Sequence, residues 1–205
     1  MTQNRSDLRK KVAREAATLL YFGVEKEYKQ AKLRAAKTLG AHFLPTNLEV
    51  AIELDKIAEE NEGAEREKRL VKMREEALKI MRLLEAYNPV LVGSVWRGTI
   101  HHDSDIDITV YCEEPNKILE ALKQAGVKVI QTERVTSTKS GEREKSFHIY
   151  VESPKKEKIE LVVRSLKMAH LREKCEIYGD VVKGLSISEL EEVLRGNPQK
   201  RFLPF

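Results

Sequence analysis

Residues 91–111 read LVGSVWRGTIHHDSDIDITVY and place two carboxylates inside an otherwise apolar segment. Side chains of a β-strand alternate between its faces, so Ile106 and Ile108 point one way while Asp105 and Asp107 point the other. Two carboxylates on one face repel each other unless a cation lies between them. The spacing favours a hard divalent cation such as Mg²⁺, which takes oxygen ligands. A solvated strand face with salt bridges explains the same spacing, so the aspartates alone do not decide between a metal site and such a face.

A Gly-Ser pair directly follows the apolar run VLV at 90–92 and precedes the aspartates. Gly93 lets the backbone turn sharply and approach a ligand closely. Ser94 then begins a short helical turn, whose free amides and hydroxyl suit a triphosphate. Arg97 adds a cation that can point at the same place. The complete pattern is therefore far more specific than any of its parts. It consists of an apolar strand followed in order by Gly-Ser, Arg-Gly-Thr and Asp-Ile-Asp.

The first 60 residues predict helices. Apolar residues recur at helical spacing from 8 to 19 and from 24 to 39, and Thr46 with Glu49 forms a capping-box pattern that begins a third helix. The charged stretch EENEGAEREKR contains Gly63, where we expect a boundary. This divides the chain into a basic helical module of residues 1–62 and a second domain of residues 63–205.

The sequence of the second domain predicts strands and helices in alternation. It begins with a long helix that stops at Asn88-Pro89. Strands are expected at 90–92, 105–112, 127–135, 146–152 and 158–164, and helices at 115–126 and 186–196. This order predicts an α/β (α+β) fold in which a mixed sheet has helices packed on it.

Composition limits the class of protein. Of the 205 residues, 41% are hydrophobic, which is enough for a packed core. No apolar run approaches the roughly 18 residues of a membrane span, and the first residues lack the apolar segment of a signal peptide. Cys112 and Cys175 are too few for a disulfide framework and lack zinc spacing. We therefore expect a cytoplasmic protein with two reduced thiols and no membrane partner.

The net charge of +4 is unevenly distributed. Residues 1–45 hold ten Lys and Arg against four Asp and Glu, whereas the remainder holds 27 against 29. Lys and Arg on a helix face can neutralise the phosphates of RNA. A solvated face over an amphipathic bundle explains the same residues. The candidates are Lys10, Lys11, Arg14, Lys29, Lys32 and Arg34.

GSVWRGT at 93–99 and SDIDI at 104–108 together resemble the signature of the DNA-polymerase-β-like nucleotidyltransferase superfamily. That superfamily includes archaeal CCA-adding enzymes, kanamycin nucleotidyltransferases and minimal nucleotidyltransferase antitoxins. The resemblance covers roughly residues 66–165. It implies a palm-like domain that transfers a nucleoside monophosphate from a nucleoside triphosphate, such as ATP, to a hydroxyl, with Mg²⁺ or Mn²⁺ as cofactor. It implies metal ligands at Asp105 and Asp107 and nucleotide binding at Gly93, Ser94, Arg97 and Thr99.

The resemblance also implies a third carboxylate on a nearby strand. Glu160 matches its position, because it is a charge inside the apolar strand KIELVVR. Many members of the superfamily carry Asp here, and Glu is one methylene longer. Glu152 and Glu157 are weaker candidates at a strand end and in a turn. The third carboxylate would help deprotonate the acceptor hydroxyl, while two ions about 4 Å apart clamp the attacking and leaving oxygens.

Two interpretations remain open for each of three aromatic side chains. Trp96 stacks on a base or packs against the sheet. His148 and Tyr150 share one face of their strand, where they line the cleft or have no part in it.

Three functions remain open at this point. The first is a nucleotidyltransferase acting on a hydroxyl of RNA or of a small molecule, with the triphosphate and metal bound within residues 63–205. The second is an antitoxin-type enzyme that modifies a protein partner, which the long N-terminal extension disfavours. The third is a weakly active nucleic-acid-binding protein that keeps the fold, which the intact Asp105, Asp107 and Glu160 disfavour.

Overall fold

The computed structural model of the chain describes residues 2–139 and 142–205, and its centre is a five-stranded mixed sheet. The strands lie in the order β1-β2-β5-β4-β3. Strands β2 and β5 pair in parallel, and the other neighbours pair antiparallel. Their bounds are β1 Val90–Val92, β2 Ile106–Tyr111, β3 Val129–Lys139, β4 Glu142–Glu152 and β5 Lys158–Arg164. The predicted fold class, a mixed sheet with packed helices, is confirmed.

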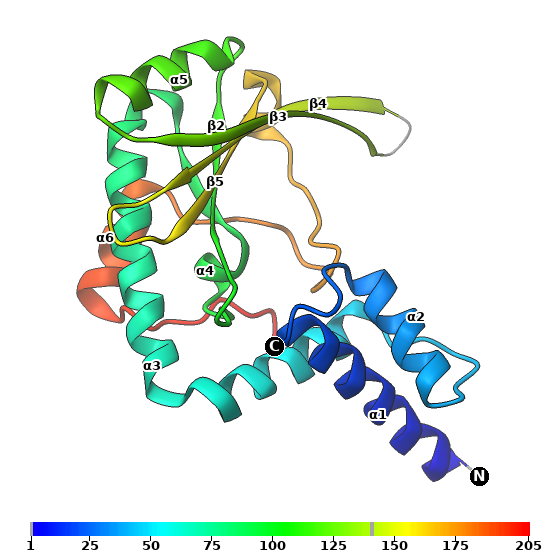
Figure 1. The fold of residues 1–205 in the computed structure, drawn as a ribbon. Helices are drawn as coiled ribbons and strands as arrows, with labels where there is room; N and C mark the ends of the chain where they lie inside the picture. Colours follow the sequence, from blue (N-terminus) through cyan, green and yellow to red (C-terminus); the bar gives the residue numbers. More distant parts are fainter. Residues whose placement is uncertain (1, 140–141) are drawn as a thin grey trace.

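Six α-helices accompany the sheet in the described residues (Figure 1). Two of them begin with capping boxes: Thr46 with Glu49, as predicted, and Ser186 with Glu189. Short 3-10 turns occupy Glu85–Tyr87 and Leu166–His170. The helices are α1 Thr2–Tyr21, α2 Tyr28–Thr38, α3 Asn47–Leu83, α4 Gly93–Arg97, α5 Pro115–Gln124 and α6 Ile187–Gly196. None of the described helices is both long enough and apolar enough to cross a membrane.

Helix α3 joins two parts of the molecule and bends at Gly63. The sequence predicts two separate helices here, whereas the structure has one element of 37 residues with a non-helical residue inside it. Gly63 has φ 49° and ψ −135°, a conformation that glycine adopts at little cost. Figure 1 shows α1 and α2 beside the first half of α3 and the sheet beside the second half.

Two hydrophobic cores lie on either side of this bend. The N-terminal core contains Val12, Ala35 and Ile57, and the larger core begins at Leu70 and continues through the sheet. The division into residues 1–62 and 63–205 stays a prediction, which the two cores and the bend support.

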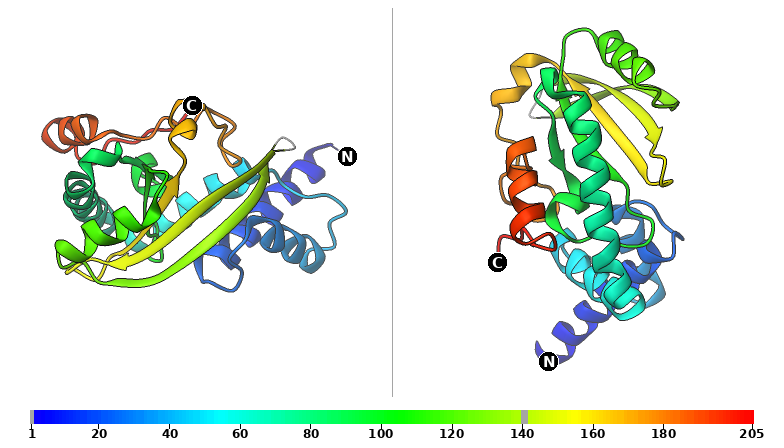
Figure 2. Two further views of the ribbon diagram at one scale, coloured as in Figure 1. Left: turned by 90° about the horizontal axis from the view of Figure 1, so that it is seen from above. Right: turned by 90° about the vertical axis from the view of Figure 1, so that its left-hand side faces the viewer.

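The two faces of the sheet differ in chemistry. Ile106, Ile108 and Leu161 point into the core, where α3 and α5 contribute further buried residues. Asp107 and Glu160 lie on the opposite face, because they alternate with these apolar residues. Figure 2 shows α3 covering one side of the sheet and the chain between β5 and α6 running on the other.

Candidate active site

Three carboxylates meet on the polar face of the sheet. Asp107 lies directly opposite Glu160 in the parallel pair of β2 and β5, and Asp105 immediately precedes β2. One ligand atom from each residue can be chosen so that all lie within 4.8 Å of one another. The alternative third carboxylates lie elsewhere: Glu157 forms an ion pair with Arg69 at 3.1 Å. The register of two neighbouring strands therefore assembles the predicted cluster around Glu160.

The cluster concentrates negative charge where solvent is scarce. Burial raises the pKa of Asp107 well above its usual value, and the charges of Asp105 and Glu160 raise it further. Burial also raises the pKa of Asp105, with a contribution from Glu160. A bound cation would remove this repulsion, and three carboxylates are ligands that Mg²⁺ and Mn²⁺ accept. The donor set therefore fits a divalent metal.

Gly93 connects β1 to α4 in close contact with this cluster. Its φ is +70°, which a side chain would strain. A Cβ atom at this position would lie 2.8 Å from Cγ of Asp107 and closer still to Oδ2. Ser94 follows at once, and Val92 before it pairs with Asp107 across the strands. The Gly-Ser pair thus brings the backbone against the carboxylates, as its sequence position predicts.

Two side chains of β4 contact Glu160. The imidazole Nδ1 of His148 lies 2.6 Å from Oε1 of Glu160, and its Nε2 lies 2.8 Å from Oγ of Ser146. Tyr150 pairs with Glu160 across the strands; burial and a hydrogen bond to Glu160 raise the pKa of its phenol to about 12. The structure therefore places both residues beside the carboxylates.

A cleft of about 770 Å³ opens beside the cluster. One wall includes Gly93, Ser94 and Asp105, together with Arg97 and Thr99. The rest of the lining comes from the N-terminal helices and from the 173–178 segment, whose Tyr178 lies against Arg97. Its residues include Leu20, Tyr28, Leu54, Lys174 and Tyr178. The cleft is thus shared between the two predicted parts of the chain, whereas the sequence suggested nucleotide binding within residues 63–205 alone.

A family model described as a nucleotidyltransferase domain matches residues 74–182, which is more than half of the chain. The chain belongs to this nucleotidyltransferase domain family. Comparison with curated protein sequences finds no match. The resemblance to nucleotidyltransferases that the sequence motifs suggested is therefore confirmed.

Several solved structures are similar to this chain. They include a cytoplasmic RNA terminal U-transferase, at 15% identity over 57% of this chain and 34% of that chain, with a TM-score of 0.33. A GLD-2/RNP-8 complex matches at 14% identity over 60% and 39%, with a TM-score of 0.35. A non-canonical poly(A) polymerase complex of GLD-2 and GLD-3 matches at 16% identity over 59% and 41%, with a TM-score of 0.33. This nucleotidyltransferase chain spans less than half the length of these matched chains.

Arg97 of this nucleotidyltransferase domain is buried and holds distant segments together. Its guanidinium donates to both carboxylate oxygens of Asp180, at 2.7 and 3.2 Å, and to the carbonyl of Phe202 at 3.1 Å. It also lies over the rings of Trp96 and Tyr178, 4.4 and 4.3 Å from their centroids. A direct role for Arg97 in binding phosphate stays a prediction, since it requires exchange of these partners.

Trp96 and Thr99 flank this arginine. The Trp96 side chain is only 4% exposed and belongs to the hydrophobic core, so it packs rather than presenting its ring to a base. The backbone N–H of Thr99 donates to the carbonyl of Ser94 at 3.0 Å, which closes the short helix.

Arg74 is a positioning residue that sequence reasoning missed. Its buried guanidinium donates to four carbonyls, which belong to Val95, Trp96, Pro198 and Lys200 at 3.1, 2.9, 2.7 and 2.8 Å. Burial lowers its pKa to about 10, so it remains charged at neutral pH. Arg74 thereby ties α4 to the C-terminal segment NPQKRFLPF, whose role the sequence did not indicate.

Arg69 supports the loop that leads to the aspartates. It donates to the carbonyls of His101 and Ser104 at 2.8 and 3.0 Å.

Arg74 had one usable signal in the sequence: it falls on the helical stripe of Leu70 and Ala77, where a charged residue is unexpected.

Proposed function

We propose that this protein transfers a nucleoside monophosphate from a nucleoside triphosphate to a hydroxyl of RNA or of a small molecule. The observation that carries the proposal is the carboxylate cluster beside Gly93 and Ser94, at the wall of a cleft of about 770 Å³. Membership of the nucleotidyltransferase domain family supports the same reaction.

The triphosphate binds where the Gly-Ser pair meets the cleft. The hydroxyl of Ser94 donates a hydrogen bond to a phosphate oxygen, and Gly93 leaves space for the chain to approach Asp107. Lys174 and Lys158 line the same cleft and bring positive charge to the phosphates. Leu20 and Tyr28 supply apolar and aromatic surface in the same cleft, which suits the nucleoside.

Asp105 and Asp107 hold the metal, together with Glu160. A bound Mg²⁺ or Mn²⁺ supplies positive charge that stabilises the transferred phosphoryl group. The raised pKa of Asp107 in the free protein is the expected state of a carboxylate whose counter-charge comes from a ligand.

Glu160 accepts the proton of the attacking hydroxyl. Its Oε1 is held by His148 at 2.6 Å, while the Tyr150 side chain lies beside it. These contacts fix the orientation of the carboxylate, and a general base must be positioned within hydrogen-bond reach of the proton it takes. Positioning and electrostatics suffice, and the enzyme forms no covalent intermediate.

The N-terminal module contributes to acceptor binding if the acceptor is RNA. Lys10, Lys11 and Lys29 are exposed on its helices. Arg14 and Arg34, which the sequence also suggested, form ion pairs with Glu60 at 2.6 Å and Glu25 at 3.0 Å. The exposed lysines are therefore the stronger candidates for contacts with phosphate.

Incubation with each of the four labelled triphosphates, Mg²⁺ and total cellular RNA tests the proposal. We expect label on RNA with the unaltered protein and none with Asp107→Asn. Ser94→Ala should weaken triphosphate binding and leave binding of metal alone unchanged. Label on a protein instead would favour the antitoxin-type alternative. Absence of triphosphate binding and of any labelled product would refute nucleotidyl transfer.

A further inference from the structure

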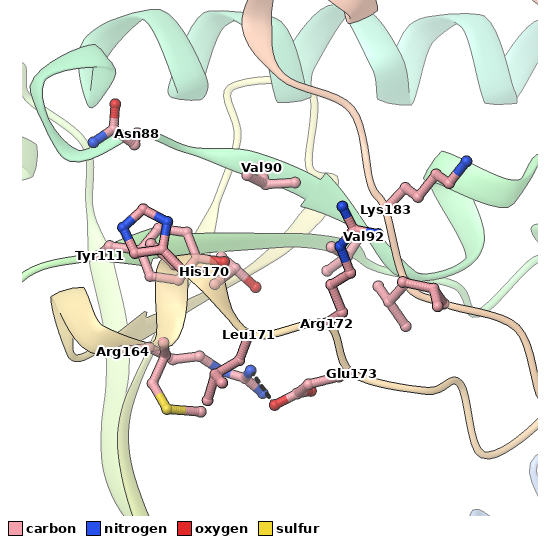
Figure 3. Close-up of a pocket in the computed structure, with 15 residues that line it drawn as sticks. Asn88, Val90, Val92, Tyr111, Arg164, His170, Leu171, Arg172, Glu173 and Lys183 are labelled. Atoms are coloured by element: carbon pink, nitrogen blue, oxygen red, sulfur yellow. Dashed lines mark hydrogen bonds and ion pairs between the residues drawn. The ribbon is translucent and has the colours of Figure 1, made fainter.

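A second cavity lies over the sheet (Figure 3). It is on the same face as the carboxylates, because Thr109 and Tyr111 of its lining follow Asp107 at two-residue spacing along β2. Its volume is about 860 Å³. Its floor includes Val90 and Val92 of β1 and Thr109 and Tyr111 of β2. Thr109 is two residues beyond Asp107 on one strand face, so the cavity begins about 7 Å from the metal site.

The chain between β5 and α6 covers this cavity and brings cations to it. Arg172 and Lys183 lie near Val92, while His170 lies at the Tyr111 end (Figure 3). Arg172, Lys183 and His170 are all exposed at the rim. Arg164 and Glu173 form an ion pair at 2.8 Å in the wall. The cavity therefore offers positive charge at the end nearest the carboxylates and aromatic surface at the other.

The two cavities extend in opposite directions along β2: the first reaches Asp105, and the second begins at Thr109. Both are lined by Val92, Glu173 and Val182, which separate them. The cleft with Ser94 lies towards the start of β2, since Val92 pairs with Asp107 and the Gly-Ser pair follows it. The second cavity extends towards the end of β2 through Thr109 and Tyr111.

Phosphoryl transfer requires the attacking and leaving oxygens to lie roughly in line on either side of phosphorus. If pyrophosphate leaves on the side of Ser94, the attacking hydroxyl must come from the other side of the carboxylates. The second cavity is a space of sufficient size on that side. Its cations suit a phosphate and its aromatic end suits a base.

We infer that this second cavity binds a nucleotide as the acceptor, an inference that rests on the proposed nucleotidyl transfer. A phosphate of the acceptor pairs with Arg172 and Lys183, and its base lies against Tyr111 and His170. The acceptor hydroxyl oxygen forms the new bond to the α-phosphorus, and the bond to the pyrophosphate oxygen breaks. The hydroxyl proton passes to Glu160. The acceptor is the 3′ end of an RNA chain or a free nucleotide, which share this chemistry.

Binding of a short probe tests the cavity without involving the N-terminal module. The probe is a trinucleotide of adenosine with a 5′ fluorescent label and a free 3′ hydroxyl, measured by anisotropy with Mg²⁺. The double variant Arg172→Ala/Lys183→Ala is compared with Lys123→Ala/Lys128→Ala, which removes the same charge from exposed positions on and after α5.

We expect the cavity variant to bind the trinucleotide roughly tenfold more weakly, since two charge-assisted contacts are lost. Its salt dependence should flatten by about 0.7 in log–log slope for each lost contact. The Lys123/Lys128 control should stay within about twofold of the unaltered protein, and His170→Ala should lose roughly fivefold through lost stacking. Affinity for a non-hydrolysable triphosphate should be the same in all four proteins.

A parallel titration with adenosine monophosphate separates the two sources of acceptor. Loss of trinucleotide affinity alone in the cavity variant identifies an RNA end, and loss of mononucleotide affinity alone identifies a free nucleotide. Unchanged affinity for both probes, or an equal loss in the Lys123/Lys128 control, overturns the inference while triphosphate binding persists. Failure of the proposed function is distinct, because the unaltered protein would then neither bind triphosphate nor transfer label.

Discussion

Gly93 and Asp107 are in such close contact that a methyl group on the glycine would lie 2.8 Å from Cγ of the aspartate. The same glycine has φ +70°, so it is required both by its backbone conformation and by its neighbour. This pair joins the Gly-Ser turn to the carboxylate cluster.

Gly93→Ala should therefore disturb the metal site as well as the fold. The left-handed conformation alone costs an alanine about 1–2 kcal/mol, and displacement of Asp107 adds to this. Gly126→Ala is the matched control, because Gly126 has φ +72° with nothing within 4 Å of its Cβ position. Urea unfolding and calorimetry with Mn²⁺ should show both variants destabilised, but only Gly93→Ala with weaker metal binding. Equal metal affinity in the two variants would contradict the contact.

Asp107→Asn should lower the affinity for Mg²⁺ or Mn²⁺ while the fold survives. The substitution removes a partly buried carboxylate whose ionised form is repelled by Asp105 and Glu160, so the metal-free protein should be equally or slightly more stable. Asp103→Asn serves as control, since Asp103 is exposed and pairs with Lys158 at 2.9 Å. If calorimetry shows the same metal affinity for Asp107→Asn as for the unaltered protein, Asp107 is not a ligand of the metal.

His148→Ala should lower the transfer rate without weakening triphosphate binding. Loss of the 2.6 Å contact leaves the Glu160 carboxylate free to rotate, which impairs its proposed role as base. We expect a decrease of roughly 10²-fold in kcat, within the range for acid–base positioning. His42→Ala is the control, because His42 is exposed in the N-terminal module. A fall in triphosphate affinity with unchanged kcat would argue for a different role.

The salt bridge between Arg9 and Glu49 should make stability depend on pH. Arg9 donates to both oxygens of Glu49, at 2.6 and 2.8 Å, and chiefly this hydrogen bonding lowers the pKa of Glu49 to about 2. Because the folded pKa lies below the unfolded value of about 4.3, the stabilisation is present above pH 4.3 and is lost as pH falls towards 2. Both side chains are over a third exposed, so we expect at most about 1 kcal/mol.

Thermal melts of the unaltered protein and Glu49→Gln should measure this contribution. Gln keeps the capping geometry but loses the charge. The difference between the two proteins should be largest at pH 7 and should vanish near pH 2. A difference that is independent of pH would mean that the ion pair contributes nothing.

The sequence predicted the parts of the site that depend on local periodicity. Alternation placed Asp105 and Asp107 on one face, because a strand has only two faces, whereas the resemblance, and not periodicity, pointed to Glu160. The Gly-Ser turn was equally accessible, since a glycine directly after an apolar strand indicates a sharp turn of the backbone. Such inferences need no knowledge of which segments meet in space.

The parts that sequence reasoning missed depend on contacts between distant segments. Arg97 binds Asp180, 83 positions away, and Arg74 binds the carbonyl of Lys200, 126 positions away. No period in the chain encodes such pairs. The sequence placed a boundary at Gly63 but did not indicate that α3 continues beyond it, because Gly63 interrupts helical φ and ψ without ending the element. The shared cleft was missed for the same reason, since it brings residues of α1, α2 and α3 together with the Gly-Ser turn.

This shared cleft changes how the role of the N-terminal module in RNA binding should be tested. Deletion of residues 1–62 would remove Leu20, Tyr28 and Leu54 from the cleft, so triphosphate binding would fall whether or not the module binds RNA. The substitution Lys10→Ala/Lys11→Ala/Lys29→Ala avoids this, because these side chains are exposed and do not line the cleft. Lys72→Ala/Lys123→Ala/Lys128→Ala removes the same charge outside the module and serves as control.

If the module binds RNA, the Lys10/Lys11/Lys29 variant should bind a structured RNA of several helical turns more weakly and with a flatter salt dependence. Each lost phosphate contact reduces the log–log slope by about 0.7 to 0.9, so three contacts should reduce it by roughly 2 to 3. The control should keep the slope of the unaltered protein, and triphosphate affinity should be unchanged in both variants. Identical RNA affinity and slope in the two variants would leave the lysines as a solvated face over the bundle, because a specific phosphate site must respond to its own charges.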